Sequence, residues 1–183
     1  MAEPLLKSWS VDDFLAWEAQ QDERYELIDG RVLAMVGGTN AHALIKGNLY
    51  AALRSRLRGR TCQPIVDGPK IVTDQGSYYP DLIVTGDPIV PGHDRIDAPT
   101  AIVEVLSRST AERDRAGKWT GYQDIPSLQH YLLVWQSERR IELITRQAKG
   151  WHLETIRPPE PSVELSAIKA KLTLDEIYED SGT

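Results

Sequence analysis

Apolar side chains recur at four-residue steps in the second quarter of the chain, at Ile45, Leu49, Leu53 and Leu57. Because this spacing puts side chains on one face of a helix, the segment TNAHALIKGNLYAALRSRLRGR predicts an amphipathic helix that begins at Thr39 or Asn40. Three more stretches are typical of helices: SVDDFLAWEAQ, STAERDRAGKWTGYQD and TLDEIYED. The first of these begins with Ser10, whose side chain can cap it.

Short apolar runs bounded by turn residues predict strands between these helices. Two runs flank Asp29-Gly30, a dipeptide that favours a tight hairpin turn. Further runs read CQPIV, KIVT, YYPDLIVT, TAIVEVLS and HYLLVW, and we expect RIELIT and WHLETI to form a hairpin across RQAKG. The order predicts a mixed β-sheet flanked by helices, an α/β or α+β fold. The length of 183 residues suits a single domain over residues 1–183.

Composition narrows the class of protein. Apolar residues make up 41% and charged residues 26% of the chain, as in ordinary globular proteins. The apolar runs are far shorter than the roughly 18–20 residues that span a bilayer, and the N-terminus lacks a signal-peptide pattern. One cysteine allows no internal disulfide and fits a reducing compartment, so we expect a cytoplasmic protein with no membrane partner.

The net charge of −6 argues against nonspecific coating of nucleic acid, which needs many phosphate contacts from Lys and Arg. A local basic patch remains compatible with it. An acidic balance also suits a site that gathers carboxylates around a cation.

Two carboxylates lie where apolar side chains are expected. Glu104 shares a strand face with Ile102 and Leu106, so it points into a cleft or a covered face. Asp81 follows Pro80 at the start of the preceding strand, and the loop between the two strands is long enough to let them pair. Neighbouring carboxylates repel unless they bind a proton or a cation. Mg²⁺, which often takes one or two carboxylates, fits this pair, and Mn²⁺ could replace it.

A lysine on the next helix completes the candidate site. Lys118 lies four residues from both Asp114 and Tyr122, so the three share a helix face. If that helix packs over the Glu104 strand, the Lys118 ammonium reaches the carboxylates and can hold a water molecule or stabilise charge on a phosphate.

Other interpretations of the carboxylates stay open. Glu104 could pair with a nearby arginine, since buried carboxylates also take part in structural ion pairs. The arginines in question are Arg108, Arg113 and Arg115. Asp81 could be an ordinary turn residue beside a proline.

Lys118 could instead form an exposed pair with Asp114. His42 extends the apolar face of its helix and could be a core-edge residue, although at a helix N-terminus it could also meet a phosphate. Glu26 lies in the first predicted hairpin and could line a solvated strand face.

The order of these motifs resembles a known family. A Pro-Asp at a strand start, a Glu in the next apolar strand and a nearby lysine are typical of PD-(D/E)XK nucleases. The chain resembles the Uma-two family of restriction endonucleases within that superfamily. The resemblance rests on these segments in order: RYELIDGRVLAM, then His42, YYPDLIV, AIVEVLSRST and DRAGKWTGYQDIPSLQHYLLV. The resemblance covers most of the chain, from about Asp12 to beyond Trp135.

The resemblance implies a restriction-endonuclease-like fold and a role for each position. Asp81 and Glu104 would be metal ligands, with the backbone carbonyl of Val105 as a third. The superfamily usually has its lysine two residues after that Glu, where this chain has Leu106, so Lys118 would be a migrated equivalent.

Glu26 and His42 occupy positions that the family places near the cleft. The implied activity is Mg²⁺-dependent hydrolysis of DNA that leaves a 5′-phosphate and a 3′-hydroxyl. A homodimer would suit the cutting of both strands of a duplex. The alternatives are a noncatalytic nuclease-fold module that binds nucleic acid or protein, and a hydrolase of another phosphate ester.

Overall fold

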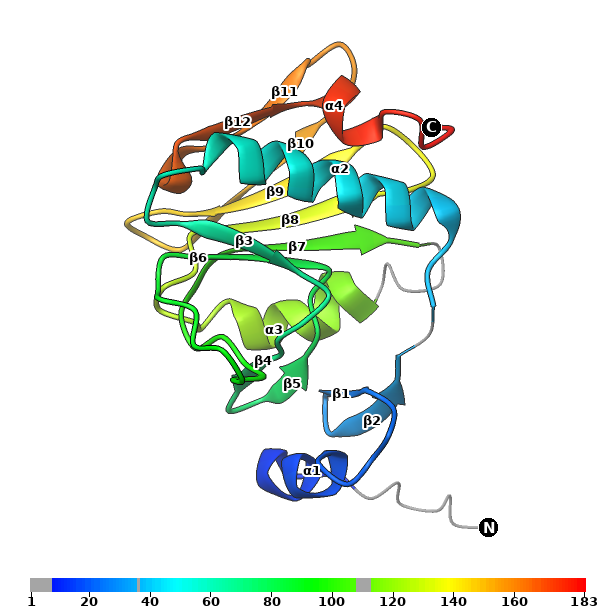
Figure 1. The fold of residues 1–183 in the computed structure, drawn as a ribbon, viewed down its shortest axis with the longest axis vertical. Helices are drawn as coiled ribbons and strands as arrows, with labels where there is room; N and C mark the ends of the chain where they lie inside the picture. The colour runs from blue at the N-terminus through cyan, green and yellow to red at the C-terminus, as the bar shows by residue number, and fades with distance from the viewer. Residues whose placement is uncertain (1–7, 36, 108–112) are drawn as a thin grey trace.

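The computed structural model describes residues 8–35, 37–107 and 113–183, and the side chains of residues 113–115 are outside that description (Figure 1). The helices are α1 (Val11–Glu18), α2 (Asn40–Arg56), α3 (Trp119–Tyr122) and α4 (Leu174–Tyr178), with a π-helical segment η1 (Arg113–Lys118) and a 3₁₀ segment η2 (Ser166–Ile168). The strands are β1 (Tyr25–Ile28), β2 (Arg31–Ala34), β3 (Gln63–Val66), β4 (Ile71–Thr73), β5 (Gly76–Tyr78), β6 (Leu82–Thr85), β7 (Pro99–Leu106), β8 (His130–Trp135), β9 (Ile141–Arg146), β10 (Trp151–Ile156), β11 (Ser162–Leu165) and β12 (Ala170–Thr173).

The strands form three sheets. The large sheet has six strands in the order β10-β9-β8-β7-β6-β3, and its β7–β8 pair is parallel while the other pairs are antiparallel. A smaller sheet has the order β2-β1-β5-β4, and β11 pairs with β12. The expected mixed sheet flanked by helices is therefore confirmed. No helix in the described ranges is both long enough and apolar enough to span a bilayer.

Each face of the large sheet carries its own apolar core, because side chains alternate along a strand. On one face, α2 packs the predicted stripe of Ile45, Leu49 and Leu53 against strand residues such as Val103. On the other face, Tyr122 of α3 packs against strand residues such as Ile102. Figure 1 shows α2 and α3 on opposite sides of the large sheet. Glu104 shares the α3 face with Ile102.

Several local predictions are confirmed. Ser10 accepts a hydrogen bond from the Asp13 backbone at 3.2 Å and caps α1. Asp29 and Gly30 have φ values of 50° and 72°, the left-handed conformation that the β1–β2 turn requires. The β9–β10 hairpin also forms as expected.

Two segments differ from their predictions. The run YYPDLIVT is not one strand, because Tyr78 ends β5 in the small sheet while β6 begins at Leu82 in the large sheet. Pro80 lies between them and has no N–H to donate to a ladder. The predicted helix over residues 109–124 is π-helical from Arg113 to Lys118, and residues 108–112 lie outside the described chain.

Candidate active site

The β6–β7 ladder places Asp81 beside Glu104. Leu82, the first residue of β6, pairs with Val103, so the preceding residue, Asp81, lies opposite Glu104. Oδ2 of Asp81 accepts a hydrogen bond of 2.7 Å from the backbone N–H of Val105, the next residue on β7. The two strands pair as expected.

Glu104 belongs to a buried ion cluster with Glu26 and Lys118. The Lys118 Nζ lies 2.9 Å from Oε1 of Glu26 and 3.1 Å from Oε1 of Glu104. All three residues are at most 4% exposed. They come from β1, β7 and the end of η1. The three side chains carry one net negative charge, which is costly away from water unless other groups stabilise it.

Two further donors hold the carboxylates of this cluster. The backbone N–H of Tyr79 donates to Oε1 of Glu26 at 2.8 Å. The hydroxyl of Tyr122 donates to Oε1 of Glu104 at 3.1 Å. Burial first, and then the negative charge of Glu104, raise the pKa of Tyr122 well above its ordinary value, so its hydroxyl stays protonated and keeps donating.

Close packing of η1 and α3 against the small sheet places Lys118 beside Glu26 and Glu104. A Cβ at Gly117 would lie 2.7 Å from the Ile28 side chain, and a Cβ at Gly121 would overlap the Tyr78 hydroxyl. These glycines let η1 and α3 approach β1 and β5. The π-helical turns also change which face each residue of the segment presents, and such turns are often found at functional sites.

Asp81 has its own partners from the other side of the sheet. Its Oδ1 lies 2.8 Å from Nε2 of His42, the third residue of α2, and 4.0 Å from Nζ of Lys46. Lys46 lies closer to Asp67, at 2.7 Å. Thr39 caps α2 by accepting from the His42 backbone at 3.2 Å, and a Cβ at Gly38 would lie 2.9 Å from the His42 ring.

The five predicted site residues therefore form two adjoining groups. Glu26, Glu104 and Lys118 make one group on the α3 face, and Asp81 and His42 make the other toward α2. The groups meet where Asp81 contacts β7. Sequence reasoning did not assign a site role to four neighbours that the structure adds: Lys46, Asp67, Tyr79 and Tyr122. Of these, Lys46 and Tyr122 could have been suggested by their four-residue spacing from His42 and Lys118.

The alternative interpretations have different outcomes. The exposed pair for Lys118 is wrong, because its side chain is buried between two glutamates. A solvated position for Glu26 is also wrong, because Glu26 is only 4% exposed. An arginine partner for Glu104 stays untested, because Arg108 and the side chains of Arg113 and Arg115 lie outside the described residues.

The chemistry of the donors suits a hard divalent cation. The candidate ligands are the carboxylates of Asp81, just before β6, and Glu104, on β7. Mg²⁺ prefers oxygen ligands of this kind, and their negative charge attracts a cation. Within residues 8–35, 37–107 and 113–183, no three His, Cys, Asp or Glu side chains gather into a group that could hold a metal ion. A site with two carboxylates and a backbone carbonyl needs no such group. An ionised carboxylate has about four lone-pair positions, so the hydrogen bonds that Asp81 and Glu104 accept can coexist with a bound cation.

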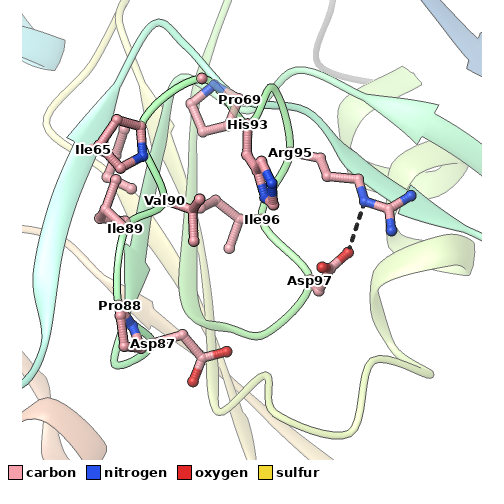
Figure 2. Close-up of a pocket in the computed structure, with 12 residues that line it drawn as sticks. Ile65, Pro69, Asp87, Pro88, Ile89, Val90, His93, Arg95, Ile96 and Asp97 are labelled. Carbon is pink, nitrogen blue, oxygen red and sulfur yellow. Dashed lines mark ion pairs between the residues drawn. The ribbon is translucent and has the colours of Figure 1, made fainter.

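A separate cavity of about 550 Å³ lies between β3 and the loop of residues 87–97. Figure 2 shows its apolar wall, formed by Ile65, Ile89 and Val90 among others, with an Arg95–Asp97 ion pair of 3.1 Å at its side. None of the five predicted site residues lines this cavity.

Comparisons with known proteins identify two relatives, a solved structure of similar fold and the family of this chain. The chain is 35% identical over 176 residues to the uncharacterized protein slr1290 of Synechocystis, covering 92% of this chain and 90% of that one. It is 28% identical to the uncharacterized protein sll1609 of the same organism, covering 89% and 96%. A crystal structure of "a putative nuclease belonging to DUF820" from Anabaena variabilis has a similar fold, with a TM-score of 0.77 at 16% identity over 93% of this chain and 97% of that one. The Uma2 family, described as "Putative restriction endonuclease", matches residues 11–175, and the chain belongs to this family.

Proposed function

We propose that this protein is a metal-dependent endonuclease that hydrolyses phosphodiester bonds of DNA. One observation carries the proposal: the Asp81 carboxylate contacts the backbone of Val105, the residue after Glu104, and a buried ammonium contacts Glu104. Membership of the Uma2 family supports the same reaction class.

Asp81 and Glu104 would hold Mg²⁺, or Mn²⁺ in its place, together with the backbone carbonyl of Val105. Since the N–H and C=O of one strand residue point to the same side, the Val105 carbonyl faces the side on which its N–H meets Asp81. When bound, the cation would offset the negative charge of the scissile phosphate and make an attacking water more acidic.

Lys118 would act beside these carboxylates. Its ammonium can orient the attacking water or stabilise the negative charge that develops on the phosphate. Glu26 holds this ammonium in place through the 2.9 Å contact. Leu106, where the superfamily usually has its lysine, is fully buried in the apolar core, so the ammonium reaches Glu104 from the helix instead.

His42 would meet a DNA phosphate. It lies in the first turn of α2, where backbone N–H groups and the helix dipole favour anions. The contact with Asp81 fixes the direction of its ring. Attack in line with the leaving oxygen would give a 5′-phosphate and a 3′-hydroxyl.

A plasmid-nicking assay tests the proposal. We expect cleavage of supercoiled DNA in Mg²⁺ or Mn²⁺, none in EDTA, and a loss of at least about 100-fold in Asp81→Ala and Glu104→Gln, since each removes a group that acts directly on charge in the transition state. Glu154→Gln, at an exposed position of β10, is the matched control and should keep full activity.

Two results would contradict the proposal. One is cleavage that survives in both variants, and the other is DNA binding without cleavage that ignores both substitutions. The second result would favour the noncatalytic binding module, which the acidic net charge also suits.

We further propose a cytoplasmic homodimer, because two sites related by a two-fold axis suit the cutting of both strands of a duplex. Light scattering coupled to size-exclusion chromatography should give twice the mass of the 183-residue chain, and a monomer mass at micromolar concentration would contradict the dimer.

A further inference from the structure

We propose that Tyr122 is a positioning residue, whose hydroxyl holds the Glu104 carboxylate in the orientation that binds a divalent cation. The inference rests on the proposed function, because it assumes that Glu104 is a metal ligand. It assigns a role to a side chain outside the set of Asp81, Glu104, Lys118, Glu26 and His42.

The position of the Tyr122 hydroxyl is fixed by its surroundings. Tyr122 is fully buried, and its ring packs edge-on against Tyr78 at 4.9 Å and against Tyr131 at 5.3 Å. Edge-to-face contacts at these distances are favourable and hold the ring plane. The hydroxyl therefore donates to Oε1 of Glu104 from a rigid base, at 3.1 Å.

The Tyr122 hydroxyl differs from Lys118, which also donates to this oxygen. Lys118 also contacts Oε1 of Glu104, but it divides its contacts between Glu104 and Glu26. In the proposed reaction the Lys118 ammonium would also contact water or phosphate, and Tyr122 would add a second hold on Glu104. A hydroxyl is neutral, so it orients the carboxylate without cancelling the charge that attracts a cation.

Groups that orient metal ligands typically contribute about 10- to 100-fold to metal affinity. We therefore expect Tyr122→Phe to weaken Mn²⁺ binding, measured by calorimetry without DNA, by at least about 10-fold. In cleavage assays the variant should lose kcat at low Mn²⁺, recover it at saturating Mn²⁺, and keep the KM for DNA.

Tyr78→Phe is the matched control. Tyr78 is a neighbouring buried tyrosine whose ring packs against Tyr122 at 4.9 Å, whereas Oε1 of Glu104 accepts from the Tyr122 hydroxyl. The Tyr78→Phe variant also loses a buried hydroxyl, but it should keep the wild-type Mn²⁺ affinity within about twofold. Replacement of Tyr122 by 4-aminophenylalanine, which restores a donor at the same place, should recover most of the affinity, and this variant decides the question if Tyr122→Phe fails to fold.

The outcomes separate the two proposals. If the wild-type protein binds Mn²⁺ and cuts DNA while Tyr122→Phe matches Tyr78→Phe, the role of Tyr122 is wrong and the proposed function stands. If the aminophenylalanine protein binds as weakly as Tyr122→Phe, the role of Tyr122 is likewise wrong. If the wild-type protein neither binds Mn²⁺ nor cuts, both proposals fail together.

Discussion

Replacing Lys118 by methionine tests the buried ion cluster directly. The substitution keeps the apolar stem and removes the ammonium that lies 2.9 Å from Glu26 and 3.1 Å from Glu104. Two carboxylates that are at most 4% exposed then lose their shared counter-ion. Removing one partner of a buried ion pair typically costs about 3–5 kcal/mol, because the remaining charge is left in a medium that solvates it poorly.

We therefore expect the free energy of unfolding of Lys118→Met to fall by about 3–5 kcal/mol in urea titrations at pH 7. For a chain of this size, about 1 kcal/mol lowers Tm by roughly 2–4 °C, so Tm should fall by roughly 6–20 °C. Adding Glu26→Gln to Lys118→Met removes one of the two charges. The double variant should recover about 1–3 kcal/mol, which a double-mutant cycle measures.

Lys46→Met is the matched control for this prediction. Lys46 also pairs with a carboxylate at 2.7 Å, but its partner Asp67 is 64% exposed at the side chain. An exposed pair contributes about 0–1 kcal/mol. If Lys118→Met costs no more than Lys46→Met, the idea that one ammonium holds two buried carboxylates is wrong.

Two other predictions address the scaffold. Gly121→Ala should destabilise the protein by about 1–3 kcal/mol in urea, because its Cβ would meet the Tyr78 ring at 2.8 Å. Gly47→Ala, in α2 with open space around its Cβ, should instead stabilise by about 0.5–1 kcal/mol, and equal effects would contradict the close approach of α3. Burial lowers the pKa of His130 to about 4, so the unfolded chain takes up the proton first and stability should fall as the pH drops from about 6.5 to 4. The resulting loss of stability is at most about 3 kcal/mol. Urea titrations at pH 7 and 4.5 measure it, and His130→Gln should abolish this loss. If the pH dependence of the variant is unchanged, the role given to His130 is wrong.

The parts of the fold that depend on local physics were predictable from the sequence. The spacing of Ile45, Leu49 and Leu53 defines the buried face of α2, and Asp29-Gly30 forms the expected turn. The hairpin β11–β12 was missed, because its strands are four residues long and lie in a segment rich in proline and charged residues.

Contacts between distant segments were harder to predict. The apolar context of Glu104 was enough to predict that it is covered, and the order of elements was enough to bring Lys118 near it. The contact of Lys118 with Glu26 joins positions 92 residues apart, in elements whose packing depends on two different sheets. No local pattern reports which sheet a short strand joins, as the misassignment of Tyr78 shows.

The residues of the ion cluster come from different parts of the fold, and this limits how the protein can be shortened. Glu26 belongs to the first hairpin, whereas Asp81 and Glu104 are borne by segments that the large sheet organises without it. A proteolytic product or a recombined relative that lost the first hairpin would retain Asp81 and Glu104 but lose the contact between Glu26 and Lys118. If the proposed reaction takes place, the N-terminal hairpin must therefore dock on the rest of the chain to hold Lys118 beside Glu104.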